Sequence, residues 1–286
     1  MMIINPYAFA TAVPYLDLLA TTPRAALSLR KLISTATTAI RVRRSSDNAE
    51  QDIGFSGNAL DTASLASFVG SNSAFITKFY DQTGNGEDLV QATGSKQPRI
   101  VSAGVYDAEA VFDGASDAMA IASLTLGAAQ VGVYMKTRQQ GAAPVEIIAE
   151  LSANYNSNAQ SFVLYSDSSS GASALWAGSR NTTAGSDYRL SEFPAIGLLG
   201  VMRQITVLLD RTITGNGEIA AWQGGVSAAP TVWGAPAEQT GTYSSYDLHV
   251  ASRAGSSLFR GMSLESLVVY NADTAAIRAD IEAVVA

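Results

Sequence analysis

The chain has 286 residues, 47% of them hydrophobic and only 15% charged, which is enough apolar material for one large buried core. Its formal net charge is −7, without long runs of either sign, which excludes the basic surface that nucleic-acid binding requires. Cysteine is absent, so disulfides, thiolate nucleophiles and cysteine-bound zinc are excluded as well.

The single histidine, His249, lies between Leu248 and Val250, and one histidine cannot build a multi-histidine metal centre. We expect it to be a structural strand residue. No segment reaches the ~18 apolar residues that cross a bilayer, and the start of the chain, Met1 to Pro6, lacks the basic segment of a secretory signal. We therefore expect a soluble protein, made in the cytoplasm and not inserted into a membrane.

The first predicted elements, in chain order, are a short helix, a strand and a second short helix. Thr22-Pro23 has the pattern of a helix start, and Ala25, Ala26, Leu27, Leu29 and Leu32 would continue that helix. Residues 40–43 alternate apolar with charged, as in a half-buried strand. Asp61 is predicted to cap a second helix that ends at Gly70.

From residue 74 onward, apolar runs separated by Gly, Asn, Asp and Ser predict a series of strands. The predicted strands cover 74–80, 145–151, 161–165, 173–177, 205–210, 218–223, 247–251 and 262–270. Thr214-Gly215-Asn216-Gly217 predicts a tight hairpin turn between two of them. A helix starting near Asp273, with Ile277, Ile281, Val284 and Val285 on one side, would end the chain. This rhythm predicts an antiparallel, mainly β fold of two stacked sheets with short peripheral helices.

Three segments resemble known domains. They are Ile40 to Phe55, with the sequence IRVRRSSDNAEQDIGF; Phe79 to Leu89, with the sequence FYDQTGNGEDL, followed by QPRIV at 97–101; and Phe259 to Ala272. The first two resemble the N-terminal half of the α-L-arabinofuranosidase B catalytic core and, equally, related jelly-roll modules of bacteriophage virion and tail proteins. The third is similar to the closing strand of laminin-G-like domains. The resemblance implies a concanavalin A-like jelly roll over residues 23–286, preceded by an attachment arm over residues 1–22.

The polar residues of these motifs have a structural explanation. Asp47, Asn48 and Asp81 can hydrogen-bond the backbone of the turns that contain them, and Arg41, Arg43 and Arg44 could pair with Asp47, Asp52 or Asp81. We assign Arg43, Asp47, Asn48, Asp52, Asp81 and Asn85 to a structural motif that fixes these loops. The Gly84-Asn85-Gly86 loop lacks the lysine and hydroxyl residue of a phosphate-binding loop.

Glycoside hydrolysis normally requires two carboxyl groups, about 5 to 9.5 Å apart. The resemblance implies a nucleophilic glutamate in the middle region and an acid/base aspartate before the closing strand. The corresponding segments, 174–179 and 251–256, contain neither Asp nor Glu. The best remaining pair is Glu146 and Glu150, predicted on one face of a strand but roughly 13 Å apart, so Glu150 would need a partner from another strand.

Two other catalytic or metal sites are not supported. The sequence lacks the Gly-x-Ser-x-Gly elbow of many serine hydrolases, and the base of a serine triad could only be His249. Asp52, Asp81 and Asp88 match no calcium loop, so we predict no metal and no cofactor.

Aromatic residues offer a binding alternative. Trp176 and Trp222 are predicted to be core residues, whereas Trp233, between Pro230 and Pro236, is predicted to be exposed and, with Tyr243 and Tyr246, to stack on a sugar.

Because the expected acids are missing, the sequence favours a non-enzymatic virion protein, a decoration or tail-fibre component. Such a protein would attach to other virion subunits or to copies of itself through residues 1–22. A carbohydrate-binding adhesin module that recognises a host-surface glycan and an arabinofuranosidase-like hydrolase remain as alternatives.

Overall fold

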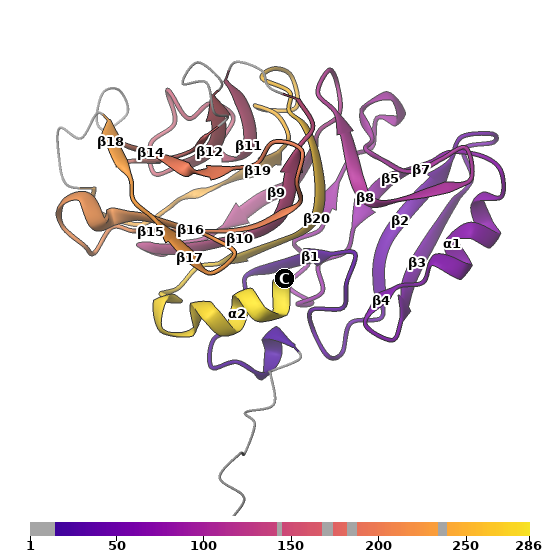
Figure 1. Cartoon of the computed structure of the whole chain (residues 1–286), viewed down its shortest axis with the longest axis horizontal. Coiled ribbons are helices and arrows are strands. Elements are labelled where there is room, and N and C mark those ends of the chain that lie inside the picture. Colours follow the sequence, from indigo (N-terminus) through magenta and orange to yellow (C-terminus); the bar gives the residue numbers. More distant parts are fainter. Residues whose placement is uncertain (1–14, 142–144, 168–173, 182–187, 234–238) are drawn as a thin grey trace, which may run out of the picture.

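Antiparallel β-strands form most of the structure, a computed structural model that describes residues 15–141, 145–167, 174–181, 188–233 and 239–286 (Figure 1). The first strands are β1 (Ala25–Ser28), β2 (Thr38–Arg44), β3 (Glu50–Ser56), β4 (Ala59–Leu60), β5 (Ala74–Phe79), β6 (Leu89–Val90), β7 (Arg99–Ser102), β8 (Val105–Asp113), β9 (Met119–Thr125) and β10 (Gln130–Gln139). They are followed by β11 (Glu146–Leu151), β12 (Phe162–Asp167), β13 (Ala174–Arg180), β14 (Tyr188–Gly197), β15 (Arg203–Asp210), β16 (Ile219–Gln223), β17 (Val226–Ala228), β18 (Thr231–Trp233), β19 (Ser245–Val250) and β20 (Gly261–Tyr270).

The helical elements are short. They are the α-helices α1 (Thr62–Val69) and α2 (Arg278–Val285) and the 3-10 turns η1 (Leu16–Leu18), η2 (Gly94–Lys96), η3 (Gly215–Glu218) and η4 (Ala275–Ile277). Helix α1 lies at one end of the molecule beside β3, and α2 lies below β10 and β15 (Figure 1). No helix in the described parts of the chain is long and apolar enough to cross a membrane.

Strand β5 joins two arms of one curved sheet. One edge of β5 pairs with β2 over the whole length of β5. The other edge of β5 is shared by two strands: β7 pairs at Ala74 and Phe75, and β6 pairs at Lys78 and Phe79. From β7 the first arm continues through β8, β20, β10, β15, β16 and β17, and from β6 the second arm continues through β9, β19, β11, β12, β13, β14 and β18. The predicted mainly β, antiparallel fold is confirmed, but its hydrogen bonds form a continuous, barrel-like sheet rather than two clearly separate stacked sheets.

The main core lies inside this curved sheet. Large apolar side chains from both arms, including Phe79, Phe112, Phe162, Phe193 and Leu267, are fully buried there. Because strand side chains alternate between faces, a regularly paired strand contributes every second residue to this core.

A second apolar cluster lies on the outer face of the sheet, beneath helix α2. Ile281 and Val285 of α2 pack there with Leu16, Tyr134 and Tyr270, and the backbone N–H of Leu16 donates to the carbonyl of Leu32 at 2.8 Å. The last part of the predicted arm, from Tyr15 onward, therefore packs against the domain. Residues 1–14 lie outside the described residues, and the boundary at residue 22 stays a prediction.

The helix expected after Thr22-Pro23 is wrong, because residues 25–28 form strand β1, paired with residues 266–269 of β20. Both faces of β1 are covered: Ala25 and Leu27 belong to the main core and Ala26 to the outer cluster. An apolar run buried on both faces has no period of two, so its sequence resembles that of a buried helix.

The other two predicted helices are confirmed. The carboxylate of Asp61 accepts a hydrogen bond from the backbone N–H of Ser64 at 3.0 Å, and Gly70 ends α1 with a φ of 60°. Helix α2 ends the chain with Ile281, Val284 and Val285 buried. Residues 214–217 do connect the antiparallel strands β15 and β16, but the tight turn predicted there is wrong, because the connection runs from Leu209 to Ile219 and contains the 3-10 turn η3.

Candidate functional site

A pocket of about 350 Å³ opens on one face of the second arm. Three tyrosines and two arginines dominate its lining: Tyr155, Tyr165, Tyr188, Arg180 and Arg253. We call it the tyrosine–arginine pocket. Its other lining residues are Val145, Ile147, Asn156, Val163, Leu190 and Leu258.

The strand register brings these side chains together. Tyr165 of β12 lies opposite Trp176 of β13, which lies opposite Glu192 of β14. In the same way, Arg180 of β13 lies opposite Tyr188 of β14. Because alternate residues of a strand share a face, Trp176 and Arg180 point to the same side of the sheet. The pocket is therefore built by side chains from neighbouring strands that are distant in sequence.

Tyr155, from the loop between β11 and β12, fills the floor of the pocket. Its ring lies directly over Gly178, where an added Cβ atom would come within 2.6 Å of the tyrosine hydroxyl. The guanidinium of Arg180 lies 4.8 Å from the centre of the Tyr155 ring and 5.2 Å from that of Tyr188. Burial raises the pKa of Tyr155 well above its usual value, so this hydroxyl stays neutral and can donate a hydrogen bond.

Arg253, from the loop between β19 and β20, forms one wall. Its Nε donates to the carboxylate of Glu150 at 3.0 Å. Glu150 is fully buried and also accepts hydrogen bonds from the hydroxyl of Ser152, at 3.2 Å, and from the backbone N–H of Tyr155. Glu150 thus fixes both the arginine wall and the tyrosine floor of the pocket.

Glu146 does not share this face, contrary to the sequence prediction. The pairing of β11 with β12 shifts register between Ile147 and Ala149. Ile147 packs with Tyr155 on the pocket side, whereas Ile148 and Ala149 both belong to the main core. This bulge reverses the alternation, so residues 147 and 150 share a face while Glu146 pairs with the buried Arg260 at 3.0 Å.

Glu192 is a second carboxylate on the pocket side that the sequence interpretation missed. It follows Tyr188 and Leu190 at intervals of two on β14, with regular pairing to β13, and only 8% of its surface is exposed. Burial raises the pKa of Tyr165, and the nearby carboxylates of Asp167 and Glu192 add to that effect. The alternation Tyr188, Leu190, Glu192 is visible in the sequence, but β14 was not among the predicted strands.

A buried polar network supports the pocket from behind. Arg189 pairs with Glu218 at 3.0 Å, and Ser179 and Tyr243 share a hydrogen bond of 2.8 Å. The guanidinium of Arg211 lies 3.7 Å from the centre of the Tyr243 ring. Burial raises the pKa of Glu218 to about 7.

Of the three predicted sugar-stacking residues, Tyr243 and Tyr246 have described side chains. Tyr243 is fully buried in this network, because Arg211 and Phe162 cover its ring, so it has no surface to offer a ligand. Tyr246 is partly buried and donates its hydroxyl to the carbonyl of Ala159 at 3.1 Å. Trp233 lies in β18, opposite Leu190, but its side chain is outside the described residues.

The predicted structural motif lies in the β2–β3 and β5–β6 region. Asp81 accepts hydrogen bonds from the backbone N–H groups of Ala26, Thr83 and Glu87, which ties its loop to β1. Asn85 donates to the carbonyl of Arg24 at 2.9 Å.

The arginines of that motif divide between exposed and partly buried partners. Arg43 donates to Asn48 at 2.8 Å and to Gln97 at 2.7 Å. Arg44 pairs with Asp47 at 2.7 Å, and Arg41 with Asp52 at 2.6 Å. Asp52 is one of the partners predicted for Arg41, and because both side chains are exposed this contact is a surface ion pair.

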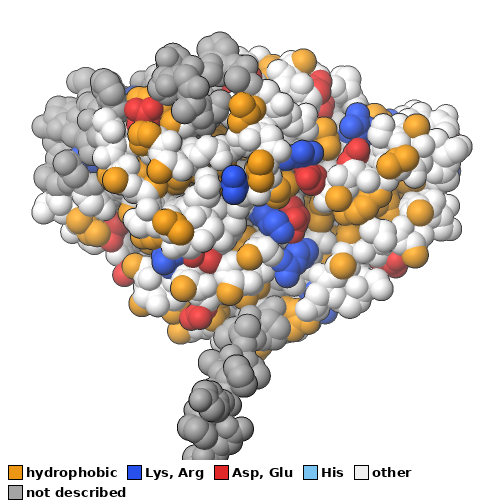
Figure 2. All heavy atoms as spheres, in the orientation of Figure 1, with side chains coloured by type: hydrophobic (Ala, Val, Ile, Leu, Met, Phe, Trp, Pro, Cys, Tyr) orange, Lys and Arg blue, Asp and Glu red, His pale blue; other side chains and the backbone are white. Residues whose placement is uncertain are grey.

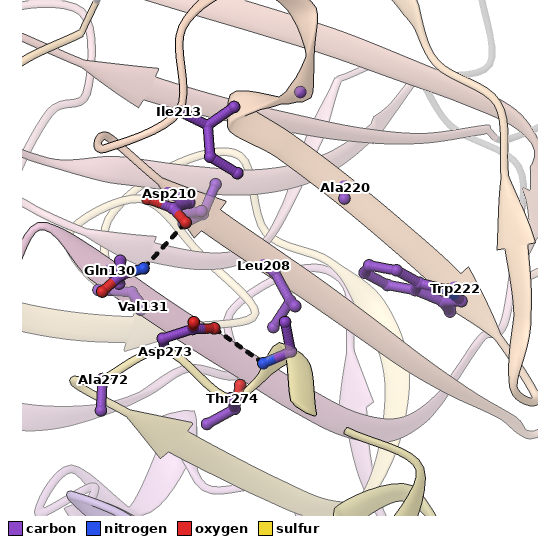
Figure 3. A pocket seen from close by; sticks show the side chains of 13 residues that line it. Gln130, Val131, Leu208, Asp210, Ile213, Ala220, Trp222, Ala272, Asp273 and Thr274 are labelled. Atoms are coloured by element: carbon purple, nitrogen blue, oxygen red, sulfur yellow. Dashed lines mark hydrogen bonds between the residues drawn. The ribbon is translucent and has the colours of Figure 1, made fainter. Parts of the chain in front are cut away.

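An apolar pocket of about 130 Å³ lies on the other arm, between β10, β15, β16 and η4 (Figure 3). Its polar side chains bond within the protein: Gln130 donates to Asp210 at 2.9 Å, and Asp273 accepts from the backbone N–H of Ala275 at 2.9 Å. Trp222 and Leu208 form apolar walls of this pocket. It offers few polar groups to a sugar, so the tyrosine–arginine pocket is the better candidate.

The outer surface carries charges of both signs. On the face that Figure 2 shows, basic and acidic side chains alternate in a band near its middle. Strands β8, β10 and β20 carry the ion pairs Lys136–Glu265 at 3.0 Å and Arg138–Glu109 at 2.8 Å. Within the described residues, no group of three or more His, Asp or Glu side chains could hold a metal ion. His249 lies in β19, as predicted, and burial lowers its pKa.

Comparison with known proteins links this architecture to one family. The family model of the α-L-arabinofuranosidase B catalytic domain matches residues 19–182. A GH54 α-L-arabinofuranosidase soaked with a cyclic sulfate inhibitor has a similar structure, with a TM-score of 0.62 at 15% identity over 93% of this chain and 63% of that one. An arabinofuranosidase complexed with arabinofuranosyl-α-1,2-xylobiose gives a TM-score of 0.61 at 14% identity, over 94% of this chain and 64% of that one.

These likenesses show a shared fold, and the chain spans less than two thirds of the length of either enzyme. No curated protein matches the sequence. The match to a catalytic family contradicts the prediction of a non-enzymatic virion protein, which depended on the absence of acids from two short segments. The absence of acids from those two segments therefore does not exclude membership of this family.

Proposed function

Because this chain belongs to the family of α-L-arabinofuranosidase B catalytic domains, we propose that it is a glycoside hydrolase of the arabinofuranosidase type. We further propose that it binds its sugar in the tyrosine–arginine pocket. The observation that carries the proposal is that residues 19–182, which match the family, include β11, β12 and β13. These strands and the loop after β11 contribute Tyr155, Tyr165 and Arg180 to the pocket.

Two carboxylates flank the floor of the pocket. Glu150 on β11 and Glu192 on β14 lie on the same side of the sheet, with β12 and β13 between them. Neighbouring strands lie about 4.8 Å apart, so three steps separate the two backbones by about 14 Å. That backbone separation is larger than the about 5 to 9.5 Å between the carboxyl groups of a glycoside hydrolase, so the proposed roles require the two side chains to approach each other above β12 and β13 when a sugar is bound.

The environments of the two carboxylates differ. Arg253 stabilises negative charge on Glu150, which suits the role of nucleophile or general base. Glu192 lies opposite Trp176 and near Tyr165, and we propose it as the general acid. The rings of Tyr165 and Trp176 stack 5.7 Å apart at 17°, and beside Glu192 they offer an aromatic surface for a sugar.

Release of 4-nitrophenol from 4-nitrophenyl α-L-arabinofuranoside tests the activity. We expect Glu150→Gln and Glu192→Gln each to lower kcat about 100-fold or more, because each removes a proton-transferring or nucleophilic group. Glu146→Gln is the matched control, since Glu146 lies on the same strand as Glu150 and also pairs with an arginine. It should keep the rate within about threefold.

Circular dichroism would confirm that each variant is folded. Equal rates in Glu150→Gln and Glu146→Gln would refute the assigned roles, and a wild-type protein that cleaves no furanoside would refute the hydrolase itself.

Glycan binding without hydrolysis is the second candidate. One observation favours it: among the described residues that line the pocket directly, none is Asp or Glu. Calorimetry with an arabinofuranosyl oligosaccharide separates the two functions. A binding module gives heat of binding and unchanged ligand, whereas a hydrolase gives free arabinose.

A further inference from the structure

We propose that the tyrosine–arginine pocket selects a sugar that carries a carboxylate, that is, a uronic acid unit, and that Arg253 is the residue that recognises it. The inference rests on the proposed function, in that it places a sugar in this pocket. It goes further by naming the chemical class of a second sugar unit, next to the neutral arabinofuranosyl group that the hydrolase would cleave.

The first observation is the way Arg253 is held. Its Nε is fixed by the buried carboxylate of Glu150 at 3.0 Å. Its backbone N–H donates to the carbonyl of Ser257 at 2.8 Å, and its carbonyl accepts from the N–H of Ser256 at 3.0 Å. Both ends of the residue are therefore anchored, so little conformational entropy remains to be lost when a ligand binds.

The second observation is the direction of the remaining donors. Arg253 lines the pocket, and its side chain keeps 17% of its surface exposed. In the described structure, its two terminal nitrogens donate to no protein acceptor. A guanidinium held through Nε presents these two nitrogens as a planar fork, which matches the two oxygens of a carboxylate.

The third observation is the distribution of charge around this fork. Arg180 adds a second guanidinium to the lining, held between the rings of Tyr155 and Tyr188. Neither Glu150 nor Glu192 lines the pocket as the two arginines do. Glu150 is fully buried behind Arg253, and Glu192 lies beside Trp176, one row of residues away from the row that contains Glu150. The residues that line the pocket directly include both arginines and, within the described residues, no Asp or Glu, so a carboxylate that enters the pocket meets these donors first.

Uronic acids differ from their parent sugars in one group, a carboxylate in place of a hydroxymethyl group. Only the carboxylate can accept hydrogen bonds from both terminal nitrogens of Arg253 and also be attracted by the positive charge of the arginines. The neutral sugar would leave one of these charged donors without an equivalent acceptor. Selection for the acid therefore follows from the geometry of one side chain.

Binding of two sugar pairs to the full chain tests this inference: galacturonic acid against galactose, and glucuronic acid against glucose. Titrations followed by NMR should show at least about tenfold tighter binding of the acid in each pair at low ionic strength. The preference should decrease as salt is added. Arg253→Gln should abolish the preference. Arg253→Lys, which keeps the charge next to Glu150 but loses the fork, should retain only part of it.

Arg138→Gln is the matched control, because Arg138 pairs with Glu109 on the first arm, away from the pocket. It should keep the full preference. Equal affinity for acid and neutral sugar in the wild type would overturn the inference, and so would an undiminished preference in a folded Arg253→Lys or Arg253→Gln protein.

The outcomes for the two proposals are distinguishable. Cleavage of the neutral arabinofuranoside without any preference for uronic acids would overturn the inference and leave the hydrolase standing. Uronic acid preference without cleavage of any glycoside would overturn the hydrolase and leave the selectivity of the pocket standing.

Discussion

At the scale of single residues, the pocket depends on Gly178, which has no side chain. Gly178 lies under the Tyr155 ring, and an added Cβ atom would come within 2.6 Å of its hydroxyl and 2.8 Å of Cζ. A Cβ atom does not come this close to a non-bonded heavy atom, so any other residue at this position must displace Tyr155. The Tyr155 ring also lies against the guanidinium of Arg180, and the backbone N–H of Tyr155 donates a hydrogen bond to the carboxylate of Glu150. One glycine therefore fixes the positions of three groups in the pocket.

We predict that Gly178→Ala destabilises the protein by about 1 to 3 kcal/mol and abolishes sugar binding in the pocket, because Tyr155 has to leave the floor. Thermal unfolding and ligand titration measure the two effects. Gly197→Ala on neighbouring β14 is the control, since an added Cβ there meets nothing within 4 Å. A Gly178→Ala protein that behaves like Gly197→Ala would show that the close packing is not maintained in solution.

Asp113 and Asp117 show how two carboxyl groups of one turn can have opposite shifts. Burial, together with the nearby charge of Asp113, raises the pKa of Asp117 to about 7. Burial alone would also raise the pKa of Asp113, but the backbone N–H groups of Ser116, Asp117 and Ala115 outweigh it and lower that pKa. Near neutral pH, the turn therefore contains one stable carboxylate and one carboxyl group that still holds a proton for part of the time.

The raised pKa of Asp117 predicts a pH-dependent stability. Between about pH 4 and pH 7 the folded protein keeps a proton that the unfolded chain has released, so stability falls as the pH rises through this window. We expect Asp117→Asn to stabilise the protein by about 2 kcal/mol at pH 8 and much less at pH 4, as measured by urea unfolding. Asp113→Asn should have the opposite effect at pH 8. Identical pH profiles for wild type and Asp117→Asn would contradict the prediction.

At the scale of elements, the bulge in β11 decides which side chains of this strand face the pocket side of the sheet. It places Ile148 and Ala149 in the main core together, and so brings Glu150 to the face on which Ile147 contacts Tyr155. Without the bulge, Glu146 and Glu150 would share a face, as the sequence pattern predicts. One additional residue in a strand thus decides which glutamate reaches the pocket.

Helix α2 is the element that covers the outer face of the sheet. Ile281 is fully buried there, in a cluster with Tyr134 and Tyr270. We predict that Ile281→Ala lowers the free energy of unfolding by about 3 kcal/mol, because it leaves a cavity in this cluster. Chemical denaturation measures the change, and Ala283→Ser on the exposed side of α2 is the control. A loss below about 0.5 kcal/mol would mean that α2 contributes little to stability.

At the scale of the whole molecule, the two arms of the sheet have different roles. The first arm, which includes β20 and β10, is covered by α2 on its outer face and carries the ion pairs of β8, β10 and β20. The second arm carries the tyrosine–arginine pocket on β11 to β14. The loop from β19 to β20 connects the arms and supplies Arg253. The pocket is therefore complete only when both arms are folded around β5.

Local chemistry alone determined several features of this protein. The Asp61 cap, the Gly70 stop, the apolar stripe of α2 and nine strands were predictable, because each depends on residues that are close in sequence. The family resemblance of the N-terminal half was also visible in the motifs, and the family match over residues 19–182 confirms it.

The tertiary structure decided the rest. Strand β1 has both faces buried, which a local pattern cannot distinguish from a helix. The β11 bulge reverses side-chain direction within one residue, and the pairing of β13 with β14 brings Arg180 and Glu192 to one face. A pocket assembled across strands depends on register, and register is set by contacts between segments far apart in the chain, which a single sequence does not reveal.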